Sequence, residues 1–151
     1  MSMNINEGLD KIREIVYEQG EKEYLTTDIL VSTVLTFPSL LIADADGDVD
    51  EDERIFLMSL AQNFIDDYDS NCEKSRLKVA ECYRLFLKLL LLNDMHKKFI
   101  LTSISEFCRY NPDAKRKIID SMYGVAYSSD GLSEVEKKEI DRIKNILSEN
   151  N

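Results

Sequence analysis

Apolar residues recur at intervals of three and four along most of the chain, the spacing that gathers them on one face of an α-helix. The pattern predicts seven helices, which begin near Ile5, Thr27, Asp50, Cys72, Asn93, Asn111 and Ser133. No segment alternates polar and apolar residues as a half-buried strand would, and the chain has only two prolines and five glycines. The sequence therefore predicts an all-α fold, a single helical bundle spanning residues 1–151.

Two predicted helices begin with residues spaced as capping boxes. These are Asp50 with Glu53, and Ser133 with Glu136. In such a box the first side chain accepts a hydrogen bond from the fourth backbone N–H, and the fourth side chain accepts one from the first. Pro38 falls inside the second predicted helix, where we expect a bend.

A run of leucines makes the fourth predicted helix apolar on nearly every side. The run extends from Leu85 to Leu92 and is interrupted only by Phe86 and Lys88. A helix that is hydrophobic all round is normally buried at the centre of a fold. We therefore predict a central position for this helix, and the alternative is an exposed groove for a partner.

One pattern occurs twice. Residues 41–53 and 125–136 each contain an apolar helix end, an Asp-Gly pair, an aliphatic residue, a capping residue and a glutamate. The second copy is one residue shorter between the glycine and the cap. Two such helix–turn–helix units predict a pseudo-symmetric bundle of related halves.

The first of these turns is crowded with carboxylates. The residues that could line its interior are Asp44, Asp46, Asp48, Asp50 and Glu53. Capping explains Asp50 and Glu53, but it does not explain three further aspartates with no Lys or Arg among them, because like charges repel unless a cation lies between them. Calcium takes six to eight oxygen ligands in a flexible cage, so this turn predicts a divalent-cation site, for calcium rather than magnesium.

The first turn is not an EF-hand, because the first ligand position would fall on Ile42, whose side chain has no oxygen. The second turn offers a smaller set of carboxylates, Asp130, Glu134 and Glu136, and predicts a weaker site. The alternative for both turns is a solvated acidic cap that binds no metal.

Charge and composition narrow the class of protein. The 151 residues carry a formal net charge of -10, which argues against nucleic-acid binding and suits a chain that attracts cations or a basic protein partner. The N-terminus shows no secretory signal, and no apolar stretch approaches the ~20 residues needed to cross a membrane. We therefore expect a cytoplasmic protein without membrane insertion.

The remaining chemistry gives no sign of an active site. The three cysteines are Cys72, Cys82 and Cys108, an odd number without metal-like spacing, so we expect reduced core thiols. His96 is the only histidine, and we expect it to be a surface residue. No serine lies in a nucleophile elbow. The prediction is a protein that is not an enzyme.

The twin turns resemble a known family. A helix end followed by Asp-Gly, an aliphatic residue and an acidic helix start, found twice in a chain of this length, is similar to the TerB tellurite-resistance family and to the TerB-like domain of DjlA co-chaperones. The first copy has the usual alanine before Asp-Gly, at Ala45, whereas the second has Ser128 and Ser129. The resemblance covers about residues 24–147. It implies some seven helices, an association with tellurite and other stresses, and metal binding at Asp46, Glu53, Asp130 and Glu136.

Two hypotheses follow from the sequence. The first is a TerB-like, non-catalytic stress module that binds a divalent cation through its Asp-Gly turns. The second is a protein-interaction adaptor whose acidic turns only cap helices and whose acidic surface recruits a basic partner.

Overall fold

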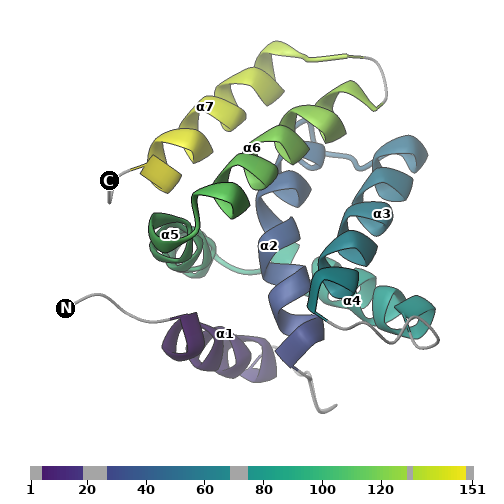
Figure 1. Cartoon of the computed structure of the whole chain (residues 1–151). Helices are drawn as coiled ribbons and strands as arrows, with labels where there is room; N and C mark the ends of the chain where they lie inside the picture. Colours follow the sequence, from purple (N-terminus) through teal and green to yellow (C-terminus); the bar gives the residue numbers. More distant parts are fainter. Residues whose placement is uncertain (1–4, 19–26, 69–74, 129–130, 149–151) are drawn as a thin grey trace.

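The computed structural model describes residues 5–18, 27–68, 75–128 and 131–148, which form seven α-helices and no strand (Figure 1). The helices are α1 (Ile5–Glu18), α2 (Thr27–Ala43), α3 (Glu51–Tyr68), α4 (Ser75–Leu90), α5 (Asp94–Tyr110), α6 (Pro112–Tyr127) and α7 (Glu134–Ser148). The predicted all-α bundle of seven helices is confirmed. The predicted start of the fourth helix at Cys72 lies outside the described residues.

Helix α2 occupies the centre of the bundle (Figure 1). It contacts each of the other six helices, and every residue from Ile29 to Ala43 is buried. The largest side chain on it, that of Phe37, is fully inaccessible to solvent. The helix is continuous through Pro38, so the bend expected there does not interrupt it.

Three of the four buried hydroxyl groups of α2 are satisfied within the helix itself, whereas Ser39 Oγ has no hydrogen-bond partner among the described residues. Ser32, Thr33 and Thr36 each donate a hydrogen bond of 2.7 Å to the backbone carbonyl oxygen four residues earlier. A buried hydroxyl without a partner would destabilise the fold, and these bonds remove that penalty without help from a neighbouring helix. A helix that contains polar residues can therefore be the most deeply buried one.

The prediction that the leucine run forms the central helix is wrong. Helix α4 buries one side against α2 and α3, with Leu85, Phe86 and Leu89 almost inaccessible. On its other side, Leu87 keeps 52% of its surface exposed, and Leu91, in the turn that follows the helix, keeps 81%. The apolar sequence of the leucine run did not reveal this exposed side, because the burial of a helix depends on how many neighbouring helices cover it.

The two Asp-Gly hairpins, α2–α3 and α6–α7, pack against each other. Helix α2 contacts both α6 and α7, and α3 contacts α6. This packing brings the α2–α3 and α6–α7 connections to the same end of the bundle.

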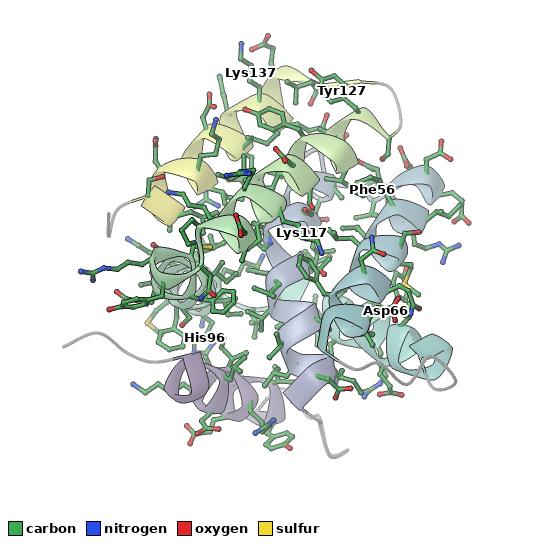
Figure 2. The ribbon with its side chains drawn as sticks, viewed as in Figure 1. Phe56, Asp66, His96, Lys117, Tyr127 and Lys137 are labelled. Atoms are coloured by element: carbon green, nitrogen blue, oxygen red, sulfur yellow. The ribbon has the colours of Figure 1, made fainter. Side chains whose placement is uncertain are left out.

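A glycine on α6 makes the close contact between α3 and α6 possible. A Cβ atom built on Gly124 would lie 2.5 Å from Cζ of the Phe56 ring, which projects from α3 (Figure 2). Such a separation is far below van der Waals contact, so either the ring or the helix must move.

We expect Gly124→Ala to lower the free energy of unfolding by about 1–2 kcal/mol, although alanine is the better helix former by about 1 kcal/mol. In a Phe56→Ala background the ring is absent, and the same substitution should instead raise stability by about 1 kcal/mol. Urea unfolding of the four proteins in this cycle measures both effects. If Gly124→Ala changed the stability equally in the two backgrounds, the close approach of Gly124 to the Phe56 ring would not be the cause of the effect.

Two cysteines are core residues, as predicted. Cys82 and Cys108 are free and buried, and burial raises the pKa of each thiol to about 11. Neither side chain is therefore a nucleophile at neutral pH. Cys72 lies outside the described residues. His96 is half-buried in the first turn of α5.

Candidate metal centre

Each Asp-Gly turn is built around a glycine in the left-handed region. Gly47 has φ of 95° and Gly131 has φ of 87°. Side chains other than glycine rarely adopt these angles, so the glycine of each repeat is required by the backbone. At the first turn the chain leaves α2 through hydrogen bonds from Asp44 N to Leu40 O, 3.0 Å, and from Gly47 N to Asp44 O, 2.9 Å.

Both predicted capping boxes are confirmed. The backbone N–H of Asp50 donates to Glu53 Oε1 at 3.0 Å, and that of Glu53 donates to Asp50 Oδ1 at 2.8 Å. The second box repeats this arrangement, with Ser133 N to Glu136 Oε1 at 3.0 Å and Glu136 N to Ser133 Oγ at 3.1 Å. The glutamates keep only 3% and 4% of their surface exposed, so each turn fixes one buried carboxylate.

The two turns meet at one pocket of about 260 Å³. Its walls carry carboxylates from both hairpins, and its lining residues are Asp46, Asp50, Glu53, Ala126, Gly131, Leu132, Ser133 and Glu136. We call this space the shared pocket. The sequence predicted the carboxylates but treated the turns as separate sites, whereas the structure joins them into a single one.

The environment of the shared pocket raises the pKa of Glu53. Burial is the main cause that raises the pKa of this carboxyl group to about 7, and the hydrogen bond from Asp50 N partly opposes it. The carboxylates of Asp50, Asp46 and Glu136 raise the pKa further. Negative charge is therefore disfavoured at this position when no cation is present.

The neighbouring cation does not neutralise the pocket. Arg54 follows Glu53 directly, but its Nε donates to Glu51 Oε2 at 2.8 Å. Its guanidinium group also lies 5.9 Å from the centre of the Tyr83 ring. No lysine or arginine is among the residues that line the shared pocket in the described part of the chain.

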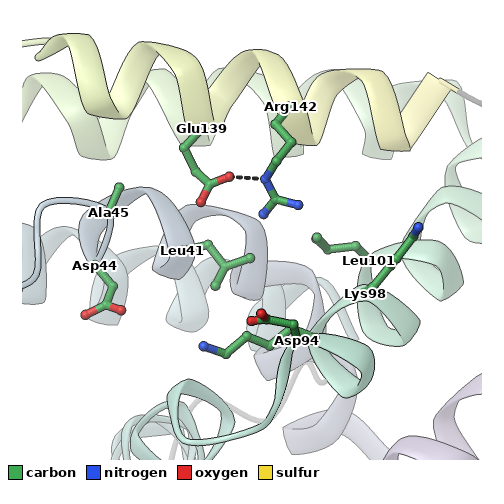
Figure 3. Close-up of a pocket in the computed structure, with 9 residues that line it drawn as sticks. Leu41, Asp44, Ala45, Asp94, Lys98, Leu101, Glu139 and Arg142 are labelled. Carbon is green, nitrogen blue, oxygen red and sulfur yellow. Dashed lines mark hydrogen bonds and ion pairs between the residues drawn. The ribbon is translucent and has the colours of Figure 1, made fainter.

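The other predicted ligands lie elsewhere. Asp44 lines a different pocket of about 500 Å³ between α2, α5 and α7 (Figure 3). Asp48 and Glu134 are exposed and do not line the shared pocket. Asp130 lies outside the described residues.

The pocket that contains Asp44 is balanced in charge. Three acidic and three basic side chains line it, namely Asp44, Asp94, Glu139, Lys97, Lys98 and Arg142. Glu139 and Arg142 form an ion pair at its edge (Figure 3). Because cationic groups already face these carboxylates, this pocket is a poor candidate for a divalent cation.

The carboxylates of the shared pocket are not arranged as a finished coordination shell. Within the described ranges, no group of three or more His, Cys, Asp or Glu side chains is positioned to hold a metal ion. Glu53 and Glu136 each use one oxygen as a helix cap, which leaves the second oxygen of each group as a possible ligand. A bound cation would have to draw the carboxylates of Asp46 and Asp50 toward these two.

No protein-family model, curated protein or solved structure matches the chain. The resemblance of the Asp-Gly turns to the TerB family stays a prediction from sequence. Among the residues that the structure describes, no helix has both the length and the apolar character to cross a membrane.

Proposed function

We propose that this chain is a non-catalytic module that binds one divalent cation in the shared pocket, with calcium preferred over magnesium. The observation that carries the proposal is the meeting of two buried glutamates, Glu53 and Glu136, from separate hairpins. Asp46 and Asp50 line the same space. These four carboxylates are the proposed protein ligands.

The physical argument is electrostatic. Burying carboxylates side by side costs free energy through lost hydration and mutual repulsion. A divalent cation would relieve both costs at once. The raised pKa of Glu53 indicates that both costs are present in the cation-free protein. Calcium accepts irregular sets of oxygens at variable distances, whereas magnesium requires a near-ideal octahedron. A pocket shared by two loops suits calcium better, with water and the Ser133 hydroxyl as further oxygen ligands.

The resemblance to the TerB family supports the same residues. It implicates Asp46 and Glu53 in the first turn and Asp130 and Glu136 in the second. Three of these four are described by the structure, and all three line the shared pocket. On this basis we propose a role in a cytoplasmic stress response of the tellurite-resistance kind, in which cation binding fastens the α2–α3 hairpin to the α6–α7 hairpin.

Isothermal titration calorimetry of metal-free protein tests the proposal with calcium, magnesium, manganese and zinc. We expect calcium to bind tighter than millimolar with one ion per chain. Asp46→Asn and Glu136→Gln should each weaken binding by about tenfold or more, because each removes one ligand charge. Asp48→Asn and Glu134→Gln make the same changes outside the pocket and should leave the affinity unaltered.

Two results would contradict this expectation. Binding of two ions per chain would mean that the turns act as separate sites. Failure of all four metals to bind tighter than millimolar would remove the cation from the function.

A second candidate is an adaptor that recruits a basic protein partner through its acidic surface. It is favoured by the capping boxes, in which each buried glutamate already has a structural role. Under it, calcium should leave the melting temperature unchanged in the parent and in an Asp46→Asn, Asp48→Asn double variant. Under the cation proposal calcium at about 100 times Kd should stabilise the parent by about 2.7 kcal/mol and the variant by less.

A further inference from the structure

The pocket of about 500 Å³ between α2, α5 and α7 has no part in the proposed cation site (Figure 3). We call it the mixed-charge pocket, because three acidic and three basic side chains line it. Two buried leucines, Leu41 and Leu101, give it an apolar floor. A concave space with an apolar floor and a few charged groups around it has the character of a small-molecule site.

Local chemistry explains two of the acidic side chains. Glu139 accepts a hydrogen bond from Arg142 Nε within α7. Asp94 is the first residue of α5, where the positive end of the helix dipole stabilises a negative charge. Neither of these carboxylates therefore needs a ligand to account for it.

Asp44 and Lys97 carry charges that their own helices disfavour. The backbone N–H of Asp44 donates to Leu40 O at 3.0 Å, so its carboxylate lies at the C-terminal, negative end of α2. Lys97 is in the first turn of α5, at the positive end. Both line the mixed-charge pocket, and within the described ranges neither side chain forms a hydrogen bond or an ion pair. Each charge therefore lacks a paired opposite charge.

Arg142 offers the pocket further donors. Glu139 uses only its Nε, so the terminal nitrogens of the guanidinium group remain available. Figure 3 shows this guanidinium group directed from α7 toward the pocket, and it shows Asp44 and Lys98 on opposite sides of Leu41. An acidic group and basic groups thus lie at different parts of one pocket, with apolar surface between them.

We propose that the mixed-charge pocket binds a small zwitterion, a molecule that carries an amine and a carboxylate on a short hydrocarbon chain. Asp44 receives the amine, and the terminal nitrogens of Arg142 receive the carboxylate as a bidentate pair. Lys97 adds to the positive potential in the pocket. The hydrocarbon chain packs on the apolar floor. A ligand of a single charge would leave either Asp44 or Arg142 without a counter-charge.

This inference does not depend on cation binding, because Asp44 and Arg142 do not line the shared pocket. Isothermal titration calorimetry of the full chain in the presence of a chelator tests it. The probes are 4-aminobutanoate and 6-aminohexanoate, each compared with the carboxylic acid and the amine of the same chain length. We expect at least one of the two zwitterions to bind with a Kd below about 1 mM, and at least about tenfold tighter than either of its singly charged analogues.

Two substitutions identify which side chain holds which end of the probe. Asp44→Asn should weaken zwitterion binding by about tenfold and bring it to within about threefold of the carboxylic acid, whose binding should not change. Arg142→Gln should weaken the zwitterion and the carboxylic acid by about tenfold and leave the amine unaffected. Asp48→Asn and Lys138→Gln, at exposed positions outside the pocket, are the matched controls and should bind like the parent.

Three outcomes would overturn the proposal. The first is that neither zwitterion binds the parent more tightly than about 10 mM. The second is a carboxylic acid or an amine that binds as tightly as the zwitterion, since the pocket would then recognise one charge alone. The third is an Asp44→Asn protein, folded with the melting temperature of the parent, that keeps the full preference for the zwitterion. Loss of calcium binding in the same preparation would bear only on the shared pocket.

Discussion

Raising the pH from about 4.5 to above 7 should destabilise the cation-free protein by on the order of 3 kcal/mol through Glu53 alone. The pKa of this carboxyl group is raised in the folded state from the model-compound value of 4.5 to about 7. Below about 4.5 the group is protonated in both folded and unfolded chains, so the stabilisation is fully present. As the pH rises through 7, the folded protein must either ionise a buried carboxyl group or keep a proton that the unfolded chain has released.

Urea unfolding in the presence of a chelator, at a pH of about 5 and about 8, measures this effect. Glu53→Gln keeps an oxygen that can accept the hydrogen bond from Asp50 N, and it cannot ionise. We therefore expect the fall in stability to be much smaller in this variant than in the parent. Added calcium should reduce the fall in the parent as well, because a bound cation stabilises the ionised form.

Glu51→Gln is the matched control, because it makes the same change two residues away on the exposed side of α3. The hydrogen bond from Arg54 lowers the pKa of Glu51, so this residue cannot produce a loss of stability near neutral pH. The control should retain the full fall shown by the parent. A Glu53→Gln protein that loses stability as steeply as the parent would assign the titration to another group.

Phe37→Ala should lower the free energy of unfolding by about 3–5 kcal/mol, the largest effect that we expect from a single substitution. Phe37 is fully buried on α2, so its removal leaves a cavity bounded by helices that cannot all move inward together. Leu91→Ala removes an apolar side chain of similar chemistry from the turn at the end of the leucine run, just after α4, where 81% of its surface is exposed. It should change the stability of the monomer by less than about 0.5 kcal/mol.

Urea unfolding of the two variants measures both losses of stability. The difference between them tests whether α2 or the leucine run of α4 is the centre of the fold. If Leu91→Ala proved as damaging as Phe37→Ala, the leucine run would be the central element after all.

The helices were predictable from sequence because their starts depend on local chemistry. The capping boxes at Asp50 and Ser133 involve residues three positions apart, so short-range spacing was enough to find them. The central helix was not predictable in this way. The all-round apolarity of the leucine run predicted a central α4, whereas the most buried helix is α2, in which the hydroxyls of Ser32 and Thr36 are hydrogen-bonded inside their own helix.

The sequence predicted residues of the site, but it did not predict that the two turns meet at one pocket. Repetition of the Asp-Gly pattern identified Glu53 and Glu136, both of which line the shared pocket. Their meeting depends on how α2 packs against α6, a contact between residues far apart in the sequence. Asp44 is directed elsewhere for a similar reason, because the end of α2 places it toward α5 and α7 rather than toward the second turn.

Both pocket glutamates also hold the first turn of a helix, which makes binding and folding hard to separate by mutation. Deleting either carboxylate outright would loosen the start of α3 or α7 as well as remove a ligand. In a random mutational scan, most harmful changes at these two positions should therefore reduce cellular abundance, and only glutamine should leave normal amounts of a protein unable to respond to the ion.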